Sequence, residues 1–555
     1  MKDVILKHCL LNAVQHEGKA NFQAVLSKIL GESPKLKSDI KMLAIEIQKV
    51  LDEINSWSLE KQKNEVEKLN IIIENKPHHK EERVLPDLSN VEKNIIMRMA
   101  PFPSGPLHIG NARMAILNDE YVKKYHGKLF LVIDDTIGSE EKIPISEAYG
   151  MIKNGLKWLG IKWNKVFYKS DRLEIFYKYA KKMLEINVAY VCECPTDKLR
   201  KNRRDGTECY CRSNDAKTNI EKWEMMLKGG YKEGEAIVRL KTDMNHENPA
   251  FRDRVLLRIS NREHPRVGNK YKVWPMLEFS WAIDDHFLGI THIIRGKDLI
   301  IEDMMEIFIW NLMGWEMPEL LHYGLLSLEG AKLSKSKSQK SISEGQFSGW
   351  EDPRTWSLQS LRKRGIKPEA IRNFILNFGM SMNDITAPDN ALYNENRKLI
   401  ESEANRYFFV QDPIQIKIKN SPKIKIAEES FHPDFPERGK RKIHVNLNKI
   451  FVSKNDFEKL KTTQVRLIGL FNVLLDKNSN FTGNEIEQDI PKIQWVSDKN
   501  INVKVTMVDG SIINGVGELD MKRLKVGEIV QLTRMFYARV DKKNKNYMQL
   551  FYTHK

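Results

Sequence analysis

The chain has 555 residues, of which 41% are apolar, 30% are charged and five are cysteines. A chain of this length is expected to form several domains of roughly 100–200 residues each. No apolar run approaches the ~20 residues of a membrane helix, and the first residues carry no signal-peptide pattern, so we expect a cytoplasmic protein without a membrane partner, whose cysteines are reduced or metal-bound. The net charge of +16 fits a polyanionic partner, although a lysine-rich surface would give the same charge without one.

Residues 1–88 are expected to form a helical appendage and a linker. Apolar residues recur on one face of a long predicted helix, at Leu43, Ile47, Val50 and Ile54. Ser58 precedes the next predicted helix and is expected to cap it. The polar stretch 74–83 predicts the linker.

Residues 94–136 predict the first half of a nucleotide-binding sheet. The stretch 94–99 is short and apolar and is followed by prolines, which indicates a buried strand. Helical spacing starts at Asn111 and stops at Gly127, and a second apolar run follows at 129–133. This β-loop-α-β order favours a doubly wound α/β fold with a ligand at the loop 103–111, where amide hydrogens and the positive end of the helix dipole converge.

Four of the five cysteines lie within twenty residues, at Cys192, Cys194, Cys209 and Cys211. Two C-x-C pairs at this separation can place four thiolates around one tetrahedral zinc, and free thiols are the alternative. A zinc held by four protein ligands would be structural, because no position stays open for catalysis. The basic strand-like runs 236–240 and 248–259 that follow can meet phosphate or the 2′-hydroxyl edge of an RNA stem.

The last third of the chain predicts β-structure. Residues 353–378 look helical, but from Arg406 onward short alternating strands dominate, as at 413–419 and 501–507. Turn signals stand at Asp509-Gly510 and Asn514-Gly515. We therefore expect one or two β-barrels at the C-terminus.

Three ordered motifs resemble those of class I aminoacyl-tRNA synthetases. His108-Ile-Gly-Asn111 resembles the HIGH motif with Asn111 in place of the second histidine, and Lys332-Leu-Ser-Lys-Ser336 resembles KMSKS with Leu333 in place of methionine. The block 274–298 is similar to the glutamyl/glutaminyl branch. The helical appendage and the β-rich C-terminus are similar to those of archaeal-type glutamyl-tRNA synthetases, whereas bacterial glutamyl enzymes have a helical anticodon domain.

The resemblance implies a multidomain α/β protein with a Rossmann-type catalytic domain. It places an N-terminal helical domain and linker at 1–88 and the first catalytic half at 89–190. An acceptor-stem insertion with the possible zinc follows at 191–288, and the second catalytic half at 289–345. A helical connecting domain at 346–400 and anticodon-binding β-barrels at 401–555 complete the chain.

The implied activity is that of a glutamate–tRNA ligase. Such an enzyme activates L-glutamate with ATP and Mg²⁺ to glutamyl-adenylate and transfers the acyl group to the 3′-terminal ribose of tRNA(Glu), and a role on tRNA(Gln) is left open. The implied catalytic residues are His108, Lys332 and Lys335. The implied ATP-binding residues are Ser104, Gly105, Leu107, His108, Ile109, Gly110, Asn111, Ser334 and Ser336. The implied glutamate-binding residues are Arg98, Asp134 and Arg295.

Within that set, Asp134 would bind the α-amino group of the substrate, and Arg98 and Arg295 its side chain, since a guanidinium can bind a carboxylate bidentately. Leu277 stands where the family commonly has a tyrosine, so a hydroxyl contact to the substrate is expected to be missing. Two alternatives compete: a glutaminyl enzyme of the same fold, which Arg295 argues against, and a tRNA-binding paralogue without activation. A monomer is expected.

Overall fold

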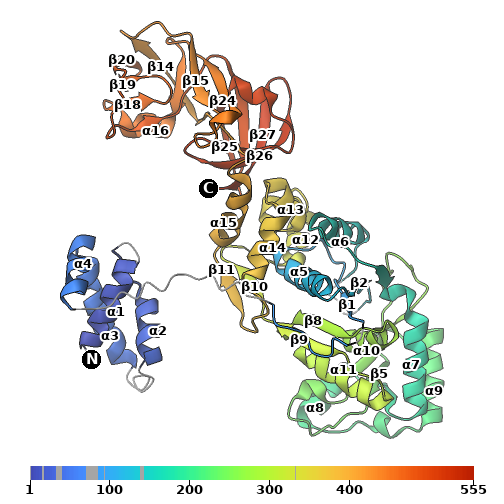
Figure 1. The fold of residues 1–555 in the computed structure, drawn as a ribbon. Helices are drawn as coiled ribbons and strands as arrows, with labels where there is room; N and C mark the ends of the chain where they lie inside the picture. Colours follow the sequence, from blue (N-terminus) through green and yellow to red (C-terminus); the bar gives the residue numbers. More distant parts are fainter. Residues whose placement is uncertain are drawn as a thin grey trace. The chain divides into compact units, whose positions relative to one another are not determined.

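The computed structural model consists of two compact units, Met1–Glu82 and Arg83–Lys555 (Figure 1). The structure describes residues 2–15, 18–32, 40–69, 85–92, 94–137, 143–331 and 333–555. The predicted linker at 74–83 lies outside the described residues. Within the described ranges, none of the helices combines the length and the apolar composition that a membrane crossing requires.

The first unit is helical, as predicted, with α1 (Lys2–Gln15), α2 (Phe22–Glu32), α3 (Ile40–Asn55) and α4 (Leu59–Lys68). The predicted apolar face of α3 is buried at Leu43, Ile47 and Ile54 and packs against α1 and α2, whereas Val50 lies at its margin. The predicted cap is confirmed, because the Ser58 hydroxyl accepts a hydrogen bond from the Lys61 amide at 3.3 Å.

The second unit begins with a parallel sheet in the order β3-β2-β1-β8-β9. Its strands are β1 (Ile96–Met99), β2 (Lys128–Ile133), β3 (Lys165–Tyr168), β8 (His292–Gly296) and β9 (Glu319–Tyr323). The chain builds outward from β1 through β2 to β3 and then returns to the other side of β1 with β8. The strand order therefore reverses between β1 and β8, which is where doubly wound folds bind ligands, at the carboxyl ends of the strands.

Helices cover both faces of this sheet (Figure 1). They are α5 (Ile109–Lys124), α6 (Ser146–Trp158), α7 (Leu173–Glu185), α10 (Leu277–Phe287) and α11 (Ile300–Met313). Alternate residues of β2 enter different cores: Leu129, Leu131 and Ile133 pack with residues of α5 and α6, whereas Phe130 and Val132 pack with residues of α7, α10 and α11. Burial on both faces explains the unbroken apolar run that predicted β2.

A second, antiparallel sheet is inserted between β3 and β8, in the order β4-β5-β6-β7. Its strands are β4 (Ala189–Cys192), β5 (Ile237–Leu240), β6 (Val255–Ile259) and β7 (Val273–Pro275), accompanied by α8 (Thr196–Asp205) and α9 (Ala216–Lys228). The basic runs noted in the sequence supply β5 and β6. The four cysteines lie at the end of β4 and in the segment between α8 and α9.

The segment 322–328, before the KLSKS motif, is divided between two sheets. β9 ends at Tyr323, and β10 (Leu326–Leu328) pairs with β11 (Ile385–Ala387). Gly324 stands at the break because a Cβ there would lie 2.0 Å from the Asn383 carbonyl oxygen. The following helices are α12 (Lys335–Ser343), α13 (Leu358–Arg364), α14 (Pro368–Leu376) and α15 (Asp389–Ile400). The predicted helix at 353–378 is thus two helices, separated at Gly365, whose φ is +90°.

The C-terminal part contains two seven-stranded, barrel-like sheets, as predicted. In the first sheet the strands follow one another in the order β12 (Asn405–Tyr407), β25 (Ile529–Leu532), β26 (Phe536–Lys543), β27 (Tyr547–His554), β23 (Asn500–Thr506), β24 (Ile512–Glu518) and β13 (Phe409–Gln411). In the second sheet the order is β21 (Lys492–Ile493), β18 (Gln464–Leu467), β19 (Asn472–Leu474), β20 (Asn478–Gly483), β14 (Pro413–Lys419), β17 (Ile450–Ser453) and β22 (Val496–Ser497). A small ribbon of β15 (Ile426–Ser430) and β16 (Lys440–His444) and the short helix α16 (Lys454–Leu460) accompany them.

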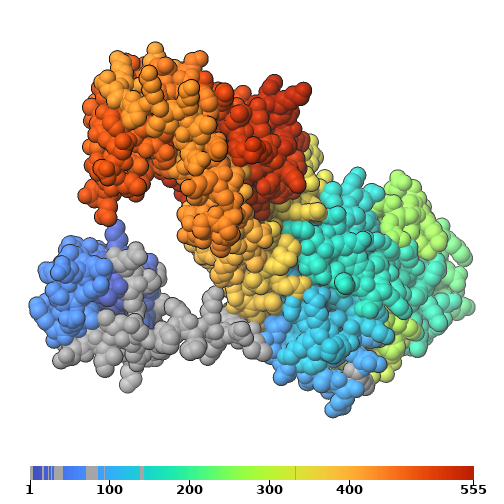
Figure 2. Space-filling model, turned by 45° about the horizontal axis from the view of Figure 1, so that its top comes forward, coloured from blue at the N-terminus to red at the C-terminus, as the bar shows by residue number. Residues whose placement is uncertain are grey.

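The first of these sheets packs on the helices before it. In Figure 2 the yellow residues that include α13–α15 adjoin the orange and red sheets, and Arg364 of α13 donates to the Thr553 carbonyl of β27 at 3.1 Å. The turn predicted at Asp509-Gly510 is confirmed, whereas the one at Asn514-Gly515 is wrong. Gly515 lies inside β24, where a Cβ would meet the Val410 carbonyl oxygen of the neighbouring strand at 2.2 Å.

Candidate active site

The loop between β1 and α5 ends in a reciprocal cap. The His108 Nδ1 accepts from the Asn111 amide, and the Asn111 Oδ1 accepts from the His108 amide, each at 3.4 Å. Asn111, at the position of the second histidine, thus has a structural role in this cap. Burial and, after it, the charge of Lys335 lower the pKa of His108 to about 3, so its ring is neutral at physiological pH. Because Nδ1 accepts, the ring proton lies on Nε2, which is a donor.

The KLSKS segment reaches this loop. Ser334 caps α12 by accepting from the Lys337 amide at 3.4 Å, and the Lys335 ammonium donates to the Phe102 carbonyl at 3.3 Å. Ser336 is exposed on the first turn of α12. Lys332 lies outside the described residues.

A cavity of about 320 Å³ lies where β1, β8 and the two motifs meet. Of the predicted residues it is lined by Arg98, His108, Gly110, Asn111, Arg295 and the motif residue Leu333. Leu107 and Ile109 are buried in the core, and the Ile109 amide donates to the Trp356 carbonyl at 3.4 Å. Their side chains therefore shape the loop and do not face the cavity. Gly105 packs against Trp350, and Ser104 is half-buried in the same loop.

Both predicted side-chain-binding arginines are held by buried carboxylates. Arg98 donates through Nε and Nη2 to Asp285 at 2.5 and 2.7 Å. Arg295 donates through Nη1 and Nη2 to Glu306, both at 2.9 Å, and also contacts Asp303. Two nitrogens of each guanidinium are thus engaged, and the Arg295 Nε is buried with no partner in the described part of the chain. Arg98 keeps a second edge, formed by Nη1 and the other N–H of Nη2, that can bind a carboxylate bidentately, whereas the terminal edge of Arg295 is occupied by Glu306. The bidentate contact to substrate therefore stays a prediction for Arg98.

Asp134 lies at the end of β2, as predicted, but it has a neighbour that the sequence did not suggest. The ammonium of the fully buried Lys169 lies 3.5 Å from the Asp134 Oδ1 and donates to the Ser280 hydroxyl at 2.7 Å. Thr136 donates to the same Asp134 oxygen at 3.2 Å. Lys169 follows β3, a strand that the sequence reasoning missed; a polar residue directly after a parallel strand is the signal that would have found it.

Two family models match the chain. The class I (E and Q) tRNA synthetase catalytic domain matches residues 94–401, and the anticodon-binding domain of the same class matches residues 404–493. The glutamate–tRNA ligase of Pyrococcus furiosus is 43% identical, and that of Methanocaldococcus jannaschii 40%, each over the full length of both chains. The chain belongs to the class I tRNA synthetases of the E and Q type.

One solved structure, a glutamate tRNA ligase from Elizabethkingia meningosepticum, matches with a TM-score of 0.41 and 18% identity, covering 56% of this chain and 71% of that one. The archaeal-type resemblance is thus confirmed by the full-length relatives, and the class I fold by the catalytic-domain model.

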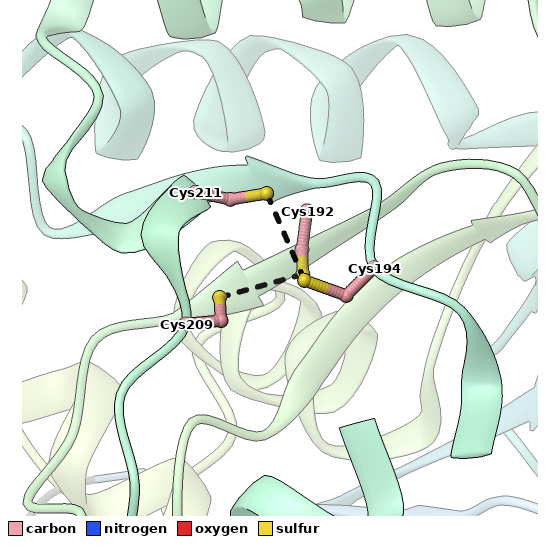
Figure 3. A group of neighbouring side chains, drawn as sticks. All are labelled: Cys192, Cys194, Cys209 and Cys211. Carbon is pink, nitrogen blue, oxygen red and sulfur yellow. Dashed lines mark hydrogen bonds between the residues drawn. The ribbon is translucent and has the colours of Figure 1, made fainter. Parts of the chain in front are cut away.

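The inserted sheet of this synthetase holds a second cluster, the four cysteines (Figure 3). All four sulfur atoms lie within 4.8 Å of one another, with 3.7 Å between Cys192 and Cys209 and 4.0 Å between Cys194 and Cys211. A tetrahedral zinc with Zn–S bonds of about 2.3 Å requires sulfur separations of roughly 3.8 Å. The residues present therefore fit a four-thiolate zinc.

Donors around the cluster suit thiolates. The Arg239 guanidinium, which is almost fully buried, reaches the sulfurs of Cys192 and Cys209 at 3.9 and 3.8 Å, and the Glu193 amide donates to Cys211 at 3.4 Å. Four thiolates around a divalent ion carry a net charge of −2, which a guanidinium partly offsets.

Proposed function

We propose that the chain is a glutamate–tRNA ligase that makes glutamyl-adenylate from L-glutamate and ATP and transfers the glutamyl group to tRNA(Glu). The proposal is carried by one observation: in a chain 43% identical to such a ligase throughout, the HIGH-like loop, the KLSKS segment and two arginines line or flank a single cavity. The anticodon-domain match at 404–493 and the net charge of +16 support tRNA as the partner.

In the activation step the α-carboxylate of glutamate attacks the α-phosphorus of ATP and pyrophosphate leaves. No protein nucleophile is needed; the residues stabilise charge that develops at phosphorus. His108 would donate from Nε2 as a neutral imidazole, and Lys335, already beside the loop, would meet the leaving pyrophosphate. Mg²⁺ enters with ATP and offsets phosphate charge.

Asp134 would bind the α-ammonium group of the substrate, and Arg98 and Arg295 would donate their remaining N–H groups to its side chain. The acyl group then passes to the terminal ribose of tRNA. The inserted sheet, with a structural zinc on the four cysteines, would support the acceptor end, and the C-terminal sheets the anticodon. We assign these roles to 191–288 and 401–555.

The arginine geometry favours one second candidate, activation of glutamine. Since Arg98 and Arg295 are paired with Asp285 and Glu306, the wall of the pocket carries less positive charge than two free guanidinium groups would give. ATP–pyrophosphate exchange with tRNA present decides between the candidates. Exchange driven by L-glutamate supports the ligase, exchange driven by L-glutamine supports the second candidate, and exchange with neither means a tRNA-binding protein without activation.

A further inference from the structure

Three cations surround one indole ring beside the cavity. The ring of Trp281, which is 5% exposed, has Arg98 at 4.7 Å, Lys169 at 4.9 Å and Arg295 at 5.1 Å from its centre. Each distance is within the range of cation–π attraction. Trp281, Arg98 and Arg295 line the cavity, and Lys169 lies behind them, in contact with the ring of Trp281.

The three cations differ in how completely they are neutralised. Arg98 has two hydrogen bonds to Asp285, and Arg295 has two to Glu306 and a further contact with Asp303. Each guanidinium charge is therefore cancelled by a carboxylate at hydrogen-bond distance.

Lys169 is paired less tightly. Its hydrogen bond goes to the neutral hydroxyl of Ser280, and the Asp134 carboxylate lies at 3.5 Å, beyond the 2.7–2.9 Å usual for a charged hydrogen bond. The next carboxylate, Asp284, is bonded to Arg172 at 2.6 Å. A fully buried lysine is costly to a protein, and burial lowers its pKa against the opposing effect of Asp134. A group retained at such a cost is a candidate for a role in the site.

We propose that Lys169 is a specificity-determining residue, whose ammonium supplies the net positive charge that selects an amino acid with a carboxylate side chain. The inference rests on the proposed function. The charges of Lys169 and Asp134, 3.5 Å apart, offset each other. When the α-ammonium group of the substrate takes Asp134 as its partner, the lysine becomes the uncompensated charge. The side-chain carboxylate of glutamate compensates it, whereas the neutral amide of glutamine does not.

The test compares Lys169→Met, which keeps the length of the side chain and removes the charge, with wild type. ATP–pyrophosphate exchange with tRNA gives KM and kcat for L-glutamate, and L-glutamine is titrated as a competitor to give its inhibition constant. We expect KM for glutamate to rise roughly thirtyfold or more, with a smaller change in kcat and a change in the glutamine constant below about threefold. Equal weakening of both ligands, or no weakening, overturns the proposal.

Lys153→Met is the matched control. Lys153 is half-buried on α6, and its ammonium donates to the hydroxyl of Tyr168, the residue before Lys169, at 2.6 Å. It is therefore a lysine of the same region with another partner, and its replacement should leave KM for glutamate and the glutamine inhibition constant unchanged. If Lys169→Met does not fold, as judged by circular dichroism, Ser280→Ala decides. This variant removes the acceptor of the ammonium and should raise KM for glutamate roughly threefold without changing the glutamine constant; an unchanged KM overturns the proposal.

The outcomes separate the inference from the function on which it rests. If wild type shows no exchange with glutamate, the proposed function fails. If wild type exchanges and the variants keep the wild-type ratio of the two constants, the inference alone fails.

Discussion

Replacing Arg295 with methionine removes the partner of two buried carboxylates. Glu306 loses two hydrogen bonds of 2.9 Å, and Asp303 keeps only His322 of its described partners. Leaving a buried charge unpaired costs about 3–5 kcal/mol, so the free energy of unfolding should fall by up to about that amount at pH 8, where Glu306 of the wild type is mostly ionised.

The loss should depend on pH. Burial raises the pKa of Glu306 to about 7 in the wild type, although Arg295 opposes the rise. A carboxylate whose folded pKa exceeds its unfolded value stabilises most below the unfolded pKa, near 4.5, and loses that stability as pH rises through the folded pKa. Without Arg295 the folded pKa rises further, so the variant should lose less stability at pH 5 than at pH 8, as measured by urea unfolding.

A double variant separates structure from specificity. Arg295→Met with Glu306→Met replaces the pair with apolar side chains and should recover most of the lost stability, to within about 1–2 kcal/mol of wild type. If Arg295 positions the substrate side chain, both variants lose roughly two to three orders of magnitude in kcat/KM for glutamate, because a charged contact is worth about 2–5 kcal/mol. A double variant that regains wild-type kcat/KM would refute this reasoning and leave Arg295 as the counterion of Glu306.

Purified protein should contain about one equivalent of zinc by atomic absorption. The Cys209→Ser variant should lose this zinc, and the control variant Cys9→Ser should keep it. Metal-free protein that charges tRNA at the full rate would contradict a structural role for the zinc. Lys335→Ala should lower the rate of activation roughly a hundredfold, about 3 kcal/mol, with little change in KM for glutamate, whereas Lys337→Ala should not; a raised KM alone would mean that Lys335 only holds substrate. Burial raises the pKa of Glu518 to about 7, so its stabilising contribution is greatest below about 4.5 and declines up to pH 7. Glu518→Gln should therefore flatten the pH dependence of Tm between about pH 4.5 and pH 7. An unchanged slope would contradict the raised pKa of Glu518.

Local sequence patterns were sufficient to predict those features that depend only on residues close together in the chain. The apolar run 129–133 predicted β2 because a strand buried on both faces needs no alternation. The Ser58 cap and the cysteine spacing also depend on neighbours in the sequence, and both predictions agree with the geometry.

Partners from distant parts of the chain could not be predicted. Asp285 lies 187 residues from Arg98, and Ser280 lies 111 residues from Lys169, so nothing local indicates that the charge of either cation is engaged. The failed turn at Asn514-Gly515 has the same origin. Its local signal equals that of Asp509-Gly510, and only the close approach of Val410 shows that Gly515 belongs to a strand.

Arg98 and Arg295, which are paired with carboxylates, and Lys169, which is paired less tightly, are proposed to contribute differently to the selection of glutamate over glutamine. A guanidinium with two nitrogens bonded to a buried carboxylate cannot turn, so its remaining N–H donors are fixed in direction before substrate arrives, which is what preorganisation requires. The same carboxylate removes its net charge, and glutamate and glutamine are nearly isosteric, so direction alone cannot separate them. Charge acts over a longer range than a hydrogen bond, and Lys169 can therefore supply it from behind Asp134. On this account, loss of Arg295 misplaces the bound amino acid and lowers kcat, whereas loss of Lys169 weakens binding and raises KM.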